Sequence, residues 1–89
     1  MEQMEIKAIY DNGGQFDRYT VYFTMQNYQG HYECLVMNEQ PFHGIGMHCT
    51  GQLGPHNGKL IQFSELPADC QKAVHQELNF PQLIIELSA

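Results

Sequence analysis

Basic residues are scarce in this sequence. Four lysines and arginines stand against ten acidic residues, which gives a formal net charge of -6 at pH 7 over 89 residues. Nucleic acids are bound mainly through clusters of Lys and Arg that neutralise phosphates, so this balance argues against a DNA- or RNA-binding surface. The aromatic residues that could stack on bases have only Arg18 close by in sequence; they are Tyr19, Tyr22, Tyr28 and Tyr32.

Long apolar runs and a disulfide framework are absent as well. The longest apolar stretch is far shorter than the ~18 residues that a membrane-spanning helix needs, so we expect no membrane partner. Residues 1–5 show neither the basic nor the apolar region of a signal peptide. The three cysteines, Cys34, Cys49 and Cys70, are an odd number and are not typical of a secreted disulfide-rich domain. Together these features predict a cytoplasmic protein.

The residues that are present suffice for one small folded domain spanning 1–89. A mass of 10.2 kDa leaves room for a single core, and no repeat or linker divides the chain. The hydrophobic fraction is 43%, with five tyrosines and five phenylalanines, which excludes a disordered chain.

Alternating apolar residues predict three strands in the first half of the chain. The segments are 4–10, 18–26 and 31–37, and the first places Met4, Ile6, Ala8 and Tyr10 on one face. Asn- and Gly-rich turns at 11–14 and 26–30 separate the segments. Because such short connections cannot join parallel neighbours, we expect an antiparallel meander.

Regular patterning stops between residues 38 and 58, which contain five of the eight glycines and three of the five histidines. We expect a long irregular loop there, because neither a strand nor a helix period is visible. A fourth strand is predicted at 59–63 and a helix at 66–79, with Cys70, Val74 and Leu78 on its apolar stripe. The tail at 82–87 favours a closing strand. This order of three strands, loop, strand, helix and strand predicts an α+β fold.

Within this irregular loop, the segment 41–58 is the candidate functional surface, and the favoured partner is another protein. Apolar side chains in a weakly charged loop are costly to leave in water, and methionine adapts to irregular partners. An equally weighted interpretation is that the loop folds back and its apolar residues cap the core. Pairing of two copies through an edge strand is a further option. The candidate partner-binding residues are Phe42, His43, Ile45, Met47, His48 and Leu53.

Two alternative hypotheses assign other functions to the same loop: a zinc-like metal site or the active site of a thiol-dependent enzyme. Imidazole and thiolate suit Zn²⁺, but the spacing of these residues matches no usual paired-ligand pattern. A nucleophilic Cys49 would need a histidine base such as His43 or His56 and an acid to orient it, and the loop offers only Glu39. We therefore favour a non-catalytic protein without cofactor or metal. If a metal binds, the ligands would be His43, His48, Cys49 and His56.

Several short motifs give the chain a resemblance to small uncharacterised proteins carried by bacteria, phages and integrated mobile elements. The resemblance extends to about residue 78 and implies a bacterial, cytoplasmic accessory protein, with no activity, cofactor or catalytic residue to carry over. Gly44 departs from the pattern, in which a proline follows the histidine, and this loosens the loop. The matching motifs are Asp11-Asn12-Gly13-Gly14, Asp17-Arg18-Tyr19-Thr20-Val21, Pro41-Phe42-His43, Gly58-Lys59 and Leu66-Pro67-x-Asp69-Cys70-Gln71-Lys72.

The charge balance yields a first prediction, that the protein has negligible affinity for DNA or RNA at physiological salt. The four basic residues, Lys7, Arg18, Lys59 and Lys72, are dispersed in sequence, and the net charge of -6 repels phosphate. Fluorescence titration with generic duplex and single-stranded oligonucleotides measures this affinity. Micromolar binding to either would show the prediction to be wrong.

Overall fold

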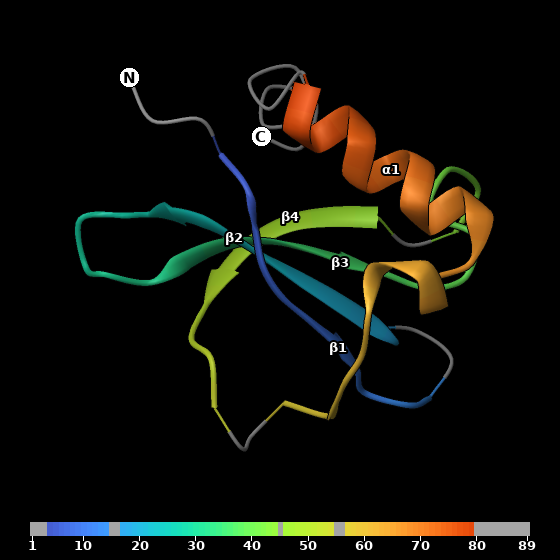
Figure 1. Cartoon of the computed structure of the whole chain (residues 1–89), viewed down its shortest axis with the longest axis horizontal. Coiled ribbons are helices and arrows are strands. Elements are labelled where there is room, and N and C mark those ends of the chain that lie inside the picture. The colour runs from blue at the N-terminus through green and yellow to red at the C-terminus, as the bar shows by residue number, and fades with distance from the viewer. Residues whose placement is uncertain (1–3, 15–16, 45, 55–56, 80–89) are drawn as a thin grey trace.

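The fold is a five-stranded antiparallel sheet with one α-helix on one of its faces (Figure 1). The computed structural model describes residues 4–14, 17–44, 46–54 and 57–79. In chain order the elements are β1 (Ile6–Asp11), β2 (Tyr19–Gln26), β3 (Tyr32–Met37), β4 (Gly46–Gly51), β5 (Lys59–Leu60), the 3-10 helix η1 (Phe63–Glu65) and α1 (Ala68–Asn79). The strands lie in the order β4-β3-β2-β1-β5, which confirms the predicted α+β class.

The predicted meander is present in β1, β2 and β3. Asp11 of β1 lies opposite Tyr19 of β2, and Tyr19 lies opposite Met37 of β3. After β1 the chain turns at Gly13 and Gly14, whose φ angles of 72° and 81° are in the left-handed region that glycine adopts without strain. The local turn chemistry therefore determined these connections, as expected.

The prediction of an irregular loop over 38–58 is wrong, because the middle of this segment forms β4. Gly46 to Gly51 pair with β3 along their whole length, from Met37 opposite Gly46 to Tyr32 opposite Gly51. Glycine, histidine and cysteine give this segment no recognisable strand pattern. Its extended conformation is held by the ladder with β3, and a tertiary pairing of this kind overrides weak local propensity.

The fourth predicted strand is present but shorter than expected. Only Lys59 and Leu60 form β5, and they pair with β1 at the edge opposite β4. The chain then leaves the sheet through η1. The α-helix starts at Ala68 rather than at Leu66, because Leu66 is extended, with ψ of 145°. The closing strand predicted at 82–87 lies outside the described residues.

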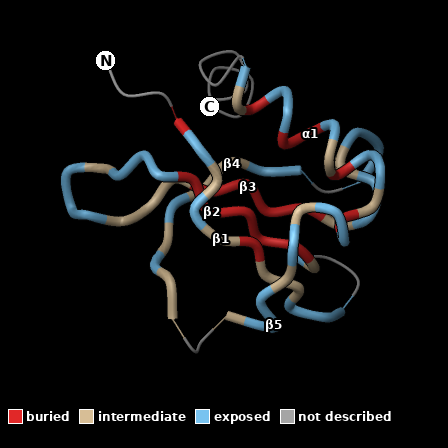
Figure 2. Tube along the Cα trace, in the orientation of Figure 1, coloured by how far each residue is buried: buried red, intermediate tan, exposed pale blue. Residues whose placement is uncertain are grey.

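Two apolar clusters pack on opposite faces of the sheet, and most buried positions fall in the centre of the sheet and on the inner side of α1 (Figure 2). The predicted core residues Val21, Phe23, Cys70 and Val74 are all fully buried, which confirms the expected strand and helix faces. The cluster beneath α1 consists of Met4, Ile9, Tyr19, Val21, Phe23, Leu35, Met37, Leu66, Cys70, Ala73 and Val74. The cluster on the other face consists of Tyr22, Cys34 and Val36, with Tyr10, Tyr32, Cys49 and Leu53 packed against it.

The alternation expected for the first strand fails at a β-bulge. The register of β1 against β2 shifts between Ile6 and Ala8. Beyond this shift Ile9 belongs to the cluster beneath α1, whereas Tyr10 packs on the opposite face. An extra residue in one strand reverses which side chains face the core, and strict period 2 cannot anticipate it.

Replacing the central core residue Phe23 by alanine should destabilise the protein by ~3–5 kcal/mol, because a fully buried ring leaves a cavity. Denaturant unfolding followed by circular dichroism measures the change. Met25→Ala is the matched control on the same strand, since Met25 is 44% exposed and should lose far less stability. Equal losses in the two variants would refute the assigned core face.

Candidate functional site

The sequence-predicted contact residues are distributed over the turn before β4, β4 itself and the segment after it. Phe42 and His43 are exposed before β4, and Met47 is exposed on β4. Leu53 is half-buried against the cluster that contains Tyr22. Ile45 lies outside the described residues. Phe42, His43 and Met47 are therefore exposed in the turn before β4 and at the start of β4.

His48 and Cys49 point to opposite faces of the sheet, because successive side chains of a strand alternate. His48 reaches Glu77 of α1, and Cys49 reaches Cys34 in the cluster on the other face. The candidate metal ligands His48 and Cys49 therefore diverge, and the candidate ligand His56 lies outside the described residues. In the described part of the chain, no group of three or more His, Cys, Asp or Glu side chains is placed to hold a metal ion.

His48 instead meets two carboxylates beneath α1, and these three residues form what we call the acid–histidine cluster: Glu33, His48 and Glu77. Its Nε2 atom lies 3.1 Å from Oε2 of Glu33 and 3.8 Å from Oε1 of Glu77. Register explains the first contact, because His48 lies opposite Leu35 and Glu33 is the next β3 residue on the same face. The helix supplies the second contact from the position one turn beyond Val74.

The acid–histidine cluster is almost closed to solvent. The side chains of Glu33, His48 and Glu77 are 17%, 13% and 1% exposed. Among the described residues, neither carboxylate oxygen of Glu77 has a hydrogen-bond partner, and the same holds for the facing atoms of Glu33 and His48. Their interaction is therefore electrostatic, and ionised carboxylates in such a place are costly.

Burial, and after it the neighbouring Glu33 carboxylate, together raise the pKa of Glu77 to about 7. Glu77 is therefore protonated in a large share of molecules near neutral pH. The cluster can hold and exchange protons. Because the Glu77 side chain is 1% exposed, its carboxyl group has little direct access from solvent.

The sequence carries a signal for Glu77 that lies outside the predicted stripe of Cys70, Val74 and Leu78. The buried helix positions are Cys70, Ala73, Val74 and Glu77, which follow the i, i+3, i+4, i+7 pattern of a core-facing stripe. An acid at the last of these positions indicates a buried carboxyl group. Its partner His48 was not identifiable, because that pairing depends on the unrecognised strand β4.

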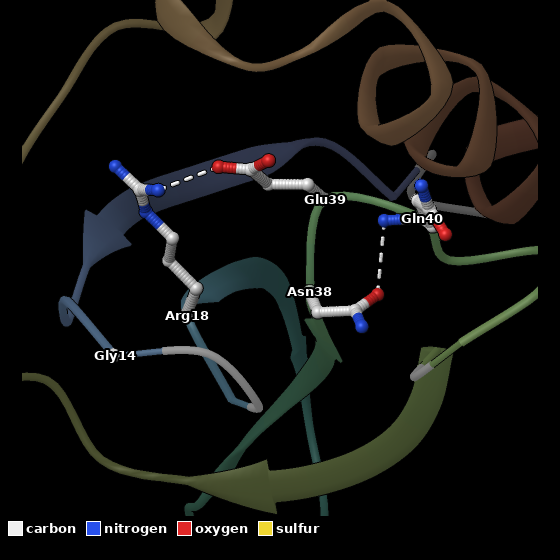
Figure 3. A pocket seen from close by; sticks show the side chains of 5 residues that line it. All are labelled: Gly14, Arg18, Asn38, Glu39 and Gln40. Carbon is white, nitrogen blue, oxygen red and sulfur yellow. Dashed lines mark hydrogen bonds and ion pairs between the residues drawn. The ribbon is translucent and has the colours of Figure 1, made fainter.

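A pocket of about 250 Å³ lies near the end of β3, lined by Gly14, Arg18, Asn38, Glu39 and Gln40 (Figure 3). Arg18 crosses it, with Nη1 at 2.6 Å from Oε1 of Glu39 and Nε at 3.2 Å from Oδ1 of Asp11. The hydrogen bond from Arg18 lowers the pKa of Asp11. Because two carboxylates already neutralise the guanidinium, this pocket is a poor site for anionic ligands.

Comparisons of the chain with protein-family models, with curated proteins and with solved structures find no match. Within residues 4–14, 17–44, 46–54 and 57–79, no helix has the length and apolar character to cross a membrane. Function must therefore be inferred from the geometry of the chain itself.

The protein should become less stable as pH rises through neutrality. The folded-state pKa of Glu77, about 7, lies above the ordinary value of 4.5 for a glutamate, so the folded chain holds a proton that the unfolded chain releases. Relative to the ionised form, the proton on Glu77 stabilises the folded protein by about 3 kcal/mol. This stabilisation is fully present below pH 4.5 and is lost as the pH rises through about 7. Thermal unfolding at a series of pH values between about 5 and 8 measures this slope.

Glu77→Gln keeps the shape of the side chain but cannot ionise, so it should flatten the pH dependence of the melting temperature. Glu5→Gln is the matched control, because Glu5 is exposed and should leave the slope unchanged. A slope that is the same in Glu77→Gln and the wild type would contradict the assignment of the proton to Glu77.

Proposed function

We propose that this protein is a non-catalytic binding domain that takes up an extended strand of a partner protein along the free edge of β4. The observation that carries the proposal is the position of β4 at the end of the sheet. In the described part of the chain, β4 pairs with β3 alone. A strand at a sheet edge presents backbone N–H and C=O groups to any chain that can extend beside it.

The two edges of the sheet differ in how well they are protected. At one edge β5 has two residues, one of them Lys59, and is followed by η1. At the other edge β4 has six residues and contains no proline, lysine, arginine, aspartate or glutamate. Short length and charge are common protections against strand pairing, and β4 has neither. This contrast favours β4 as the binding edge.

Two exposed apolar side chains lie on or next to the edge strand β4. Met47 on β4 is 51% exposed, and Phe42 in the preceding turn is 44% exposed. Strand addition derives affinity from backbone pairing and specificity from side-chain contacts of this kind. The proposed surface is narrower than the whole 41–58 segment, because His48 is turned beneath α1 and Leu53 packs on the sheet.

The charge of the protein supports a basic partner. A net charge of -6 favours approach of a strand flanked by Lys or Arg and disfavours a second copy of the same chain. Resemblance to small proteins of bacteria, phages and mobile elements, together with three free cysteines, supports a place in the bacterial cytoplasm. The partner would then be a cytoplasmic protein with an accessible extended segment.

A displayed library of random peptides, selected against the protein, tests strand addition directly. Selected peptides should be extended and should shift the backbone amide resonances of β4 in NMR spectra. Met47→Lys places a charge on the free edge and should weaken their binding by about tenfold or more.

Met25→Lys is the matched control, because Met25 is 44% exposed, close to the 51% of Met47, but lies on β2 in the interior of the sheet order. It should leave peptide affinity within about twofold of the wild type. Equal sensitivity of binding to the two lysine variants would contradict the proposal. A wild-type dimer that Met47→Lys dissociates would assign the edge to self-pairing instead.

A further inference from the structure

Two cysteines lie directly opposite each other on neighbouring strands. Cys34 of β3 pairs in register with Cys49 of β4, and their Sγ atoms are 3.7 Å apart. Opposite residues of an antiparallel pair have Cα atoms about 4.5–5.5 Å apart, which lies within the range of about 4.4–6.8 Å seen in disulfides. A bond between these sulfurs therefore requires side-chain rotation but no rearrangement of the sheet.

The surroundings of the two thiols differ, and the difference gives each a role. Cys34 is buried, whereas Cys49 is partly accessible. The Cys34 thiol donates a hydrogen bond to Sγ of Cys49, so the more accessible sulfur is also the acceptor. An incoming reagent can reach Cys49 first. Cys34 is then in position to attack the sulfur of Cys49.

Cys70 takes no part in this pair. It belongs to the cluster beneath α1, on the opposite face of the sheet from Cys34 and Cys49. Its thiol donates a hydrogen bond to the backbone carbonyl of Asn38 at 3.2 Å. The protein therefore contains one close thiol pair and one isolated buried thiol, which serves as an internal control.

We infer that Cys34 and Cys49 are a redox modification site that closes to a reversible cross-strand disulfide by exchange with a low-molecular-weight disulfide such as glutathione disulfide. The inference goes beyond the proposed function and does not depend on it. Its basis is the register of β3 and β4, the short Sγ–Sγ distance and the unequal accessibility of the two thiols.

The reaction proceeds in two exchanges. The Cys49 thiolate attacks one sulfur of glutathione disulfide, a mixed disulfide forms, and one glutathione leaves as a thiolate that takes up a proton. The Cys34 thiolate then attacks Sγ of Cys49 and expels the second glutathione. Two protein thiols are oxidised to one disulfide, and one molecule of glutathione disulfide is reduced to two thiols.

The second exchange is the slower one, since burial and the neighbouring Cys49 raise the pKa of the Cys34 thiol and keep it protonated. Its rate should therefore increase as the pH is raised. The resulting bond ties the edge strand β4 to β3. Amide hydrogens of β4 should then exchange with solvent more slowly than in the dithiol form.

Mass spectrometry of the intact folded protein in glutathione redox buffers tests the inference. The wild type should lose the mass of two hydrogen atoms, regain it with excess reduced glutathione, and yield a peptide in which Cys34 and Cys49 are linked while Cys70 stays free. Cys34→Ser should accumulate a glutathionyl group on Cys49. Cys49→Ser should react at least about tenfold more slowly, because only a buried thiol of the pair remains.

Three results would overturn the inference: a folded wild type that stays fully reduced, one that stops at the mixed disulfide on Cys49, or a disulfide that appears only after denaturation. Circular dichroism establishes that each serine variant is folded, and Cys34→Ala and Cys49→Ala provide second variants in which no hydroxyl replaces the thiol. Rapid glutathionylation of Cys70 in the folded wild type would also contradict the inference, because the reaction would then not be selective for Cys34 and Cys49.

Discussion

The pairing of β4 with β3 is the interaction on which the rest of this structure depends. It converts a glycine- and histidine-containing segment into an ordered strand and sets the alternation of its side chains. One face then receives His48, the other receives Met47 and Cys49. A shift of one residue in this register would exchange the two faces, separating the thiols and removing His48 from Glu33.

The acid–histidine cluster shows how the small core accommodates a polar group. Glu77 occupies a position on the helix that an apolar residue would fill more favourably, and within the described residues its carboxyl group faces His48 and Glu33. Neutralisation by a proton reduces the cost of burying it. Packing of α1 on the sheet is thereby linked to pH, a property that the remaining apolar contacts of the helix do not confer.

The edge strand and the thiol pair belong to the same two strands but depend on different physical properties. Strand addition depends on backbone groups along the outer side of β4, whereas disulfide formation depends on side chains that face away from α1. The two features can therefore operate separately. A bond between Cys34 and Cys49 would nevertheless restrain β4, the strand that presents the edge.

The sequence by itself determined the local features of the protein. Alternation in 18–26 identified β2 and the buried Phe23, glycines identified the turn after β1, and the apolar stripe identified α1. These features depend on residues close in the chain. The bulge in β1, the strand β4 and the contacts of Glu77 and Cys34 were decided only by the tertiary structure. Each depends on which strand lies beside another, and no short-range pattern encodes a register between distant segments.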